Sequence, residues 1–197
     1  FMHGQAFTFD GAVIYITRSG YTGEDGYEIS VPADKAQALW NTLTAQEDVL
    51  PIGLGARDSL RLEAGLSLYG HELDETVSPV EASLLWSIPK HRREHGGFPG
   101  AARIQREIAQ GPARKIVGIR PEGRAPAREG TVIMSDGNEV GVITSGGFGP
   151  SAGGPVALGF VPPDLAQPGQ KLDLIVRGKA LPAEVVKLPF VYKSFKK

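Results

Sequence analysis

The chain has 197 residues, 41% of them hydrophobic and 22% charged, with a net charge of −1, which is ordinary for a globular protein of one large domain or two small ones. Its Lys and Arg residues are scattered, so we expect no nucleic-acid partner. Because there is no cysteine, disulfides, thiolate nucleophiles and Cys-based metal sites are excluded.

No apolar run approaches the roughly 20 residues that a membrane-spanning helix needs, so we expect no membrane association. The start is neither basic nor followed by a long apolar stretch, so it does not resemble a signal peptide. The first residue is Phe1 rather than Met, and we expect the chain to be a segment of a longer protein.

The first predicted elements are two strands joined by a turn-rich loop. Residues 12–17 are apolar and β-branched, which is typical of a strand. Residues 19–26 contain three glycines together with Ser19 and Asp25, residue types that favour turns. Residues 27–31 then alternate, which places Glu28 on the face opposite the apolar side chains.

A helix is predicted directly after the second strand. Asp34 is the expected N-cap, and Gln37 follows in the capping-box position. Apolar residues recur at helical spacing behind it, at Ala36, Leu39, Trp40 and Leu43. We interpret Trp40 as part of the core.

Three further helical segments are expected. One covers residues 56–64, and one covers residues 103–109. The sequence Ser-Pro-Val-Glu at residues 78–81 has the N-cap, first-turn proline and acidic N3 residue of a strong helix start. Trp86, in the helix expected after it, is also interpreted as a core residue.

From residue 114 onward, short apolar runs alternate with turns, which predicts an antiparallel β-barrel or a sandwich. The expected strands are residues 116–119, 131–134, 140–144, 156–161, 172–176 and 183–188. The fold class is therefore α+β. We place a domain boundary at Gly111-Pro112, which gives an α+β domain of residues 1–111 and an all-β domain of residues 112–197.

Catalytic signatures such as a phosphate-binding loop or a nucleophile elbow are absent from the sequence. His91 and His95 are four residues apart, a spacing that could present two metal ligands on a helix. They lie in a strongly basic stretch, residues 90–95, that ends in two glycines. We therefore favour a solvated loop over a metal site.

Two charged residues are candidates for ligand binding. Glu28 could accept two parallel hydrogen bonds from a planar N–C–N donor edge, although an exposed strand residue or a salt bridge would look the same. Arg57 shares a helix face with Arg61 and could hold a ligand carboxylate, unless it pairs with a neighbouring acid. Tyr21, in the loop, could line a slot for a flat ligand or pack against its own turn.

Several segments, taken together, resemble the glycine cleavage T-protein family. Two long motifs carry the resemblance, Arg-Ser-Gly-Tyr-Thr-Gly-Glu-Asp-Gly-Tyr-Glu-Ile at residues 18–29 and Gly-Ala-Arg-Asp-Ser-Leu-Arg-Leu-Glu-Ala-Gly-Leu at residues 55–66. Shorter matches follow in the family's order at residues 68–70, 78–81, 98–100, 144–146 and 188–191.

This resemblance implies a three-domain fold whose last domain is a jelly-roll-like β-barrel, with tetrahydrofolate bound between the domains. It also implies an aminomethyltransferase that takes a methylene group from the aminomethyl-lipoyl arm of the H-protein. Ammonia is released and methylenetetrahydrofolate is formed. The implied location is the cytoplasm of a bacterium or the mitochondrial matrix.

By position within the motifs, the family's folate contacts correspond to Glu28 and Arg57. A further family contact is a tyrosine that corresponds to Phe195, with Tyr192 nearby. Phenylalanine at this position keeps the ring and loses the hydroxyl group. Tyr21 completes the set of expected folate-binding residues.

The family's catalytic aspartate lies in an N-terminal half to which nothing in this chain corresponds. Asp25 and Asp58 do not match it, so we expect the isolated chain to be inactive. Two alternatives stay open: a non-catalytic folate-binding module, and a related folate-dependent demethylase or oxidase domain.

Overall fold

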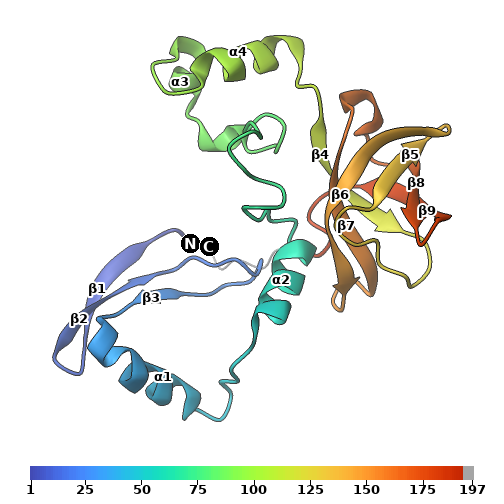
Figure 1. Ribbon diagram of the computed structural model, residues 1–197. Helices are drawn as coiled ribbons and strands as arrows, with labels where there is room; N and C mark the ends of the chain where they lie inside the picture. Colours follow the sequence, from blue (N-terminus) through green and yellow to red (C-terminus); the bar gives the residue numbers. More distant parts are fainter. Residues whose placement is uncertain (193–197) are drawn as a thin grey trace. The chain divides into compact units, whose positions relative to one another are not determined.

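A computed structural model describes residues 1–192 of the chain (Figure 1). Contacts within the chain divide it into two compact units. The first comprises Phe1–Arg61 together with Tyr192, and the second comprises Leu62–Val191. The domain boundary at Gly111-Pro112 stays a prediction.

The first unit contains a three-stranded antiparallel sheet in the order β1-β2-β3. The strands are β1 (Gly4–Phe9), β2 (Ala12–Thr17) and β3 (Glu28–Ser30). Asp10 and Gly11 join β1 to β2 with φ angles of 44° and 74°. A two-residue turn of this kind fits the twist of a hairpin. The predicted strands β2 and β3 are confirmed, whereas β1 was not predicted.

Strand pairing places Glu28 on one face of this sheet. Glu28 lies opposite Thr17, and the next residue, Ile29, lies opposite Ile16. Ile14, on the same face as Ile16, is buried. The prediction that Glu28 lies on the face away from the apolar side chains is therefore confirmed.

The helix predicted after β3 is present as a 3₁₀ turn (Ala33–Lys35) followed by α1 (Ala36–Thr44). The expected N-cap at Asp34 is wrong. Asp34 lies inside the 3₁₀ turn, and neither helical start has a side-chain capping hydrogen bond among the described residues. The core prediction for Trp40 is also wrong, because its side chain is 54% exposed.

The helix α2 (Leu54–Glu63) confirms the prediction for residues 56–64. It carries Arg57, which is exposed, and Arg61, which is buried. Both belong to the motif at residues 55–66, so one helix supplies two arginines with very different surroundings.

The helix expected to begin at Ser78 is wrong, although its capping box forms. The Ser78 hydroxyl accepts a hydrogen bond from the Glu81 amide at 3.1 Å, and the Glu81 carboxylate accepts one from the Ser78 amide at 2.9 Å. The turn then ends at Ser83, whose φ is 57°. A left-handed residue at this point stops the helix after one turn. Trp86, in the following 3₁₀ turn (Leu85–Ser87), is 79% exposed and not a core residue.

Two helices precede the barrel: α3 (Lys90–His95) and α4 (Ala101–Gln110). The prediction for residues 103–109 is confirmed by α4. The loop interpretation of residues 90–95 is wrong, because they form the short helix α3. A proline precedes it as N-cap and a left-handed glycine ends it.

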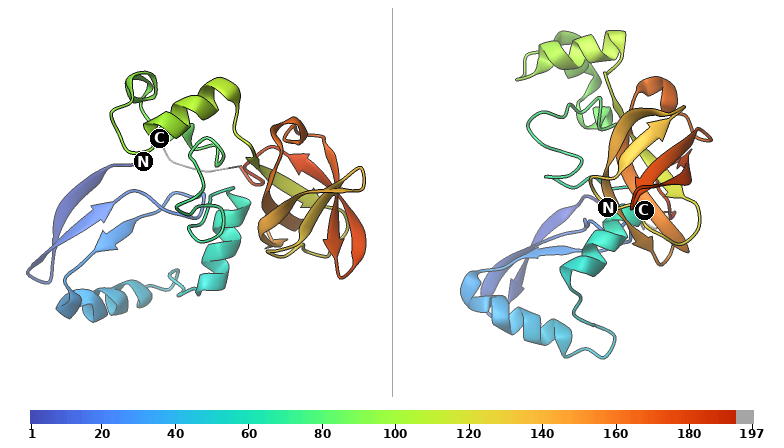
Figure 2. Two further views of the ribbon diagram at one scale, coloured as in Figure 1. Left: turned by 45° about the horizontal axis from the view of Figure 1, so that its top comes forward. Right: turned by 45° about the vertical axis from the view of Figure 1, so that its right-hand side comes forward.

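The second unit closes into a six-stranded antiparallel barrel in the order β4-β7-β6-β5-β8-β9. Strand β4 pairs with both β7 and β9, which closes the barrel (Figure 2). Fully buried branched side chains such as Ile119, Ile133, Ile143 and Leu174 fill it. The six predicted strands and the antiparallel barrel are confirmed. The strands are β4 (Lys115–Pro121), β5 (Val132–Ser135), β6 (Asn138–Gly149), β7 (Gly154–Val161), β8 (Lys171–Val176) and β9 (Lys179–Val186).

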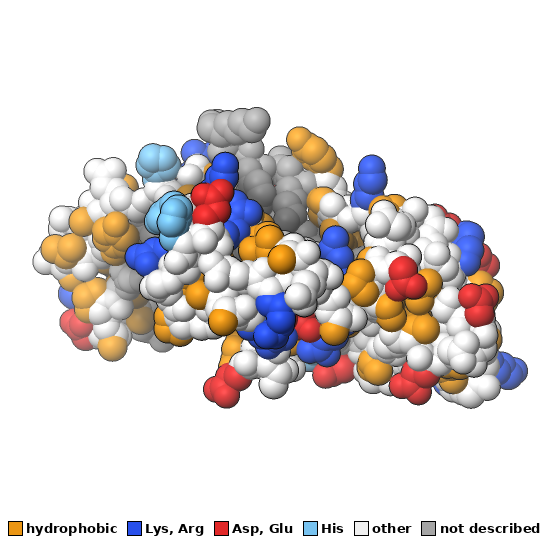
Figure 3. Space-filling view, turned by 90° about the horizontal axis from the view of Figure 1, so that it is seen from above, with side chains coloured by type: hydrophobic (Ala, Val, Ile, Leu, Met, Phe, Trp, Pro, Cys, Tyr) orange, Lys and Arg blue, Asp and Glu red, His pale blue; other side chains and the backbone are white. Residues whose placement is uncertain are grey.

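The described helices are all too short or too polar to cross a membrane. On the face shown in Figure 3, cationic and anionic side chains of the described residues are interspersed with apolar ones. This face therefore carries both signs of charge, as the net charge of −1 suggests.

Candidate functional site

The glycine-rich loop between β2 and β3 is closed by a two-point ion pair. Arg18 donates from Nε to Asp25 Oδ1 at 2.8 Å and from a terminal nitrogen to Oδ2 at 2.6 Å. The hydrogen bonds to Asp25 raise the pKa of Arg18. Because both groups sit at the surface, the pair contributes little to global stability. Its consequence is local, since it joins the two ends of the loop.

Glu28 is held from inside the same loop. Ser19 Oγ donates a hydrogen bond to Glu28 Oε2 at 2.6 Å, and Thr17 Oγ1 lies 2.9 Å from Ser19 Oγ. Glu28 is exposed, so its carboxylate is anchored at one oxygen and open to solvent elsewhere. The carboxylate could therefore pair with a planar donor edge.

Tyr21 and Arg57 come together across the first unit. The guanidinium carbon of Arg57 lies 4.5 Å from the centroid of the Tyr21 ring, within the range of a cation–π contact. Tyr21 is half-buried and Arg57 exposed. The loop that leads into Glu28 thus also supplies the ring on which Arg57 rests.

Two aspartates of the motifs, Asp25 and Asp58, are each paired with an arginine. Arg61 donates from Nε to Asp58 at 2.7 Å, and its side chain is almost fully buried. Asp25 is bound by Arg18. The ion-pairing alternative therefore holds for Arg61, and Arg57 contacts the Tyr21 ring of the loop. Of the remaining candidates, Phe195 lies outside the described residues.

The sequence does not predict Ser19 as a partner of Glu28. Ser19 lies at the start of the loop, one residue after Arg18, and an antiparallel return of the chain brings this position close to Glu28. Because several loop residues separate Ser19 from Glu28 in the sequence, their closeness in space was not predicted.

The His95 side chain contacts the backbone of His91 within α3, because His95 Nδ1 lies 2.9 Å from the His91 carbonyl oxygen. Among residues 1–192, no group of three or more His, Asp or Glu side chains is arranged to hold a metal ion.

Buried carboxylates were also missed, and they link the segment before the barrel to the rest of the second unit. Glu72 accepts hydrogen bonds from Thr144 Oγ1 at 2.6 Å and from the Leu68 amide at 3.0 Å. Glu63 accepts one from the Ala152 amide at 2.7 Å. Because buried carboxylates need such partners, we interpret them as structural.

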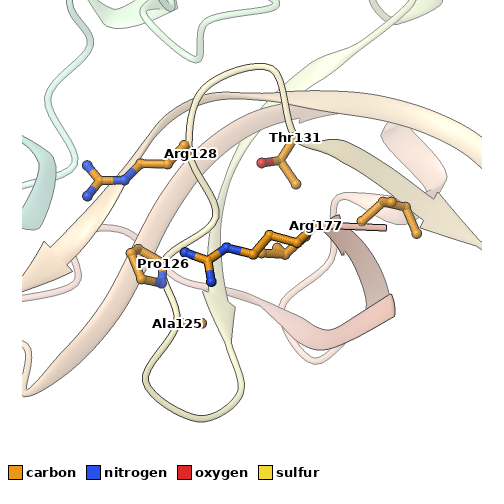
Figure 4. A pocket seen from close by; sticks show the side chains of 7 residues that line it. Ala125, Pro126, Arg128, Thr131 and Arg177 are labelled. Carbon is orange, nitrogen blue, oxygen red and sulfur yellow. The ribbon is translucent and has the colours of Figure 1, made fainter. Parts of the chain in front are cut away.

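A cavity of about 520 Å³ opens on the barrel between the segment before β5 and the β8–β9 turn. In Figure 4 the guanidinium group of Arg177 lies beside Pro126, and the guanidinium group of Arg128 points away from that of Arg177. The candidate residues of the first unit are not part of its lining, which consists of Ala125, Pro126, Arg128, Thr131, Ile175, Val176 and Arg177.

Comparison with known proteins gives two family matches in order along the chain. Residues 1–92 match the family described as the GCVT N-terminal domain. Residues 114–192 match the glycine cleavage T-protein C-terminal barrel domain. The second match covers the closed barrel described above.

Curated relatives are similar over nearly all of the chain. A protein of Schizosaccharomyces pombe named a probable mitochondrial aminomethyltransferase is 48% identical over 96% of this chain and 49% of its own length. An aminomethyltransferase of the bacterium Nostoc is 46% identical over 95% of this chain and 49% of its own length. The chain therefore spans about half the length of the curated relatives it matches.

A solved structure shows the same fold. The crystal structure of the glycine cleavage system aminomethyltransferase T from Bartonella henselae is 46% identical and has a TM-score of 0.91. The match covers 93% of this chain and 51% of that one. With two consecutive domains matched and a closed barrel in the expected place, the chain belongs to the glycine cleavage T-protein family.

Proposed function

We propose that the protein is an aminomethyltransferase of the glycine cleavage system. It transfers a methylene group from the aminomethyl-lipoyl arm of the H-protein to tetrahydrofolate and releases ammonia. The observation that carries the proposal is the arrangement of Glu28, Tyr21 and Arg57 on one loop and helix. This arrangement occurs in a fold shared with a solved aminomethyltransferase.

Each of the three residues has a role that suits folate. Glu28 accepts hydrogen bonds from the planar donor edge of the pterin, which offers parallel N–H groups to a carboxylate. Arg57 binds an anionic or carbonyl group of the ligand. Tyr21 offers an aromatic ring at the same site. Phe195 completes the set by the family's pattern.

The catalytic group is placed outside these residues. A methylene transfer needs a carboxylate held close to the reacting nitrogen. Asp25 and Asp58 are each bound by an arginine, and Glu28 is assigned to binding. This arrangement also favours a second candidate, in which the chain binds folate without catalysis by itself.

The implied partner is the lipoylated H-protein. The relatives are mitochondrial or bacterial. For this protein we propose the mitochondrial matrix or the bacterial cytoplasm, where such a multi-protein system would operate.

Titration calorimetry with tetrahydrofolate, followed by an ammonia-release assay with aminomethylated H-protein, tests the proposal. We expect the chain to bind tetrahydrofolate and to release no ammonia. A chimera that joins the chain to the unmatched half of the Schizosaccharomyces pombe relative should release ammonia. A chimera that binds folate without turnover would favour the non-catalytic module, and absence of folate binding by both proteins would contradict the folate site.

A further inference from the structure

The hydroxyl groups of Thr17 and Ser19 form two successive hydrogen bonds, each donated in the direction of the Glu28 carboxylate. A serine hydroxyl has one hydrogen to donate. Ser19 donates it to Glu28 Oε2 at 2.6 Å, a length typical of a strong bond to a carboxylate. In the contact of 2.9 Å between the two hydroxyl oxygens, Thr17 is therefore the donor and Ser19 the acceptor. The Thr17 hydroxyl also lies 3.5 Å from the Glu28 carbonyl oxygen, a longer contact that competes for the same hydrogen.

These two hydroxyl groups restrain the side chain of Glu28, which would otherwise rotate freely. Glu28 is exposed, and a glutamate at a strand surface has several accessible rotamers. Fixing a side chain of this type costs conformational entropy. A carboxylate that is already held in one orientation loses less freedom when a ligand binds.

We propose that Ser19 is a positioning residue for the folate site and acts through Glu28. This inference rests on the proposed function. Ser19 occupies one lone pair of Oε2 and fixes the plane of the carboxylate. The remaining lone pairs of both oxygens stay open for the parallel N–H groups of the pterin. Thr17 orients the Ser19 hydroxyl and has a smaller role.

Tetrahydrofolate titration of four single-residue variants of the protein measures this role. Ser19→Ala removes the donor and should weaken binding about 3- to 10-fold, the range for one hydrogen bond. Ser19→Thr keeps the hydroxyl and should restore most of the affinity. Thr17→Val should give a smaller loss than Ser19→Ala. Ser30→Ala is the matched control, because Ser30 is an exposed residue on the same strand and the same face as Glu28.

A double-mutant cycle separates positioning from a general structural effect. If Ser19 acts through Glu28, Ser19→Ala should have no further effect on affinity in a Glu28→Ala background. Additive losses would overturn the inference, because they would mean that Ser19 acts independently of Glu28. Equal losses for Ser19→Ala and Ser30→Ala would overturn it as well.

The same data distinguish the two levels of the proposal. If Glu28→Ala leaves the affinity unchanged, the folate role of Glu28 is wrong and the inference fails with it. If Glu28→Ala weakens binding and Ser19→Ala does not, the site stands and only the role of Ser19 is wrong. Thermal unfolding of each variant checks that the first unit remains folded.

Discussion

The guanidinium group of Arg57 rests on the ring of Tyr21, 4.5 Å from its centroid. A cation–π contact at an exposed site contributes about 0.5–1 kcal/mol. Here it restrains an arginine on α2 by means of a residue in the β2–β3 loop. The folate role of Arg57 and the conformation of the loop are therefore linked.

Replacing the Tyr21 ring should weaken folate binding more than removing its hydroxyl alone. We expect Tyr21→Leu to bind at least about 2- to 5-fold more weakly than Tyr21→Phe, the equivalent of one exposed cation–π contact. Fluorescence or calorimetric titration with tetrahydrofolate provides the measurement. Equal affinities for the two variants would contradict a role for the ring.

Alanine at either charged candidate should have a larger effect. Glu28→Ala and Arg57→Ala each remove a charge-assisted hydrogen bond to the ligand, worth about 1.5–3 kcal/mol. We therefore expect a loss of affinity of roughly tenfold or more for each. Glu24→Ala, in the same loop, is the control. Unchanged affinity for either candidate would exclude that residue from the site.

Acid should destabilise the second unit through Glu107. Burial acts to raise the pKa of Glu107, but hydrogen bonds from Ser78 and Arg103 and the charge of Arg103 outweigh it, so the pKa is lowered overall. The folded state thus favours the carboxylate. The resulting stability is present above the ordinary pKa of 4.5 and is lost as the pH falls through the lower pKa of the folded state.

Urea denaturation between pH 3 and pH 7 would detect this effect. We expect the free energy of unfolding of the parent chain to fall steadily below about pH 4.5. Glu107→Gln should be less stable at pH 7 and should show a shallower fall in acid. Glu47→Gln, an exposed residue, serves as the control. If the free energy of unfolding of Glu107→Gln fell in acid as steeply as that of the parent chain, Glu107 would not be the group responsible.

Gly146 in β6 leaves no space for a side chain. A Cβ atom at this position would lie 1.8 Å from the carbonyl oxygen of Ala127, which is backbone and cannot rotate away. Gly146→Ala should therefore destabilise the barrel by about 1–3 kcal/mol or more. The control is Gly154→Ala in β7, where a Cβ meets nothing within 4 Å. Thermal unfolding that is unchanged in Gly146→Ala would be the contradicting result.

The barrel was predictable because its signal is local and repeated. Each strand is a short run of β-branched residues bounded by turn formers, and closure buries these runs. The strand β1 was missed because its sequence, Gly-Gln-Ala-Phe-Thr-Phe, has little β-branching. The Asp10-Gly11 pair that follows it is a hairpin signal that could have identified it.

Other errors come from interactions that periodicity does not report. The spacing around Trp40 predicts an apolar helix face, and it does not say which surface covers that face. At Ser78 the capping box forms as its sequence predicts. Its Glu81 also pairs with Arg103 and Arg114, and the backbone turns left-handed at Ser83. Tertiary contacts therefore end a helix that local sequence begins.

The candidate site likewise has features that the sequence predicts and features that it does not. The motifs single out Glu28 and Arg57, and alternation places Glu28 on the correct sheet face. The pairing of Tyr21 with Arg57 joins residues 36 positions apart, which sequence reasoning about neighbours does not reach. Ser19 was missed for a related reason, because its partner lies across a loop.

The barrel is a closed sheet, whereas the three-stranded sheet of the first unit is open and has edge strands. The barrel has no first or last strand, so opening any part of it breaks ladders on both sides. In the three-stranded sheet, β1 and β3 are edge strands among residues 1–192. Amide hydrogens of the barrel should therefore exchange with deuterium slowest, and those of β3 much sooner. Because β3 carries Glu28, ligand binding should be visible as slowed exchange in the strand that is otherwise least protected.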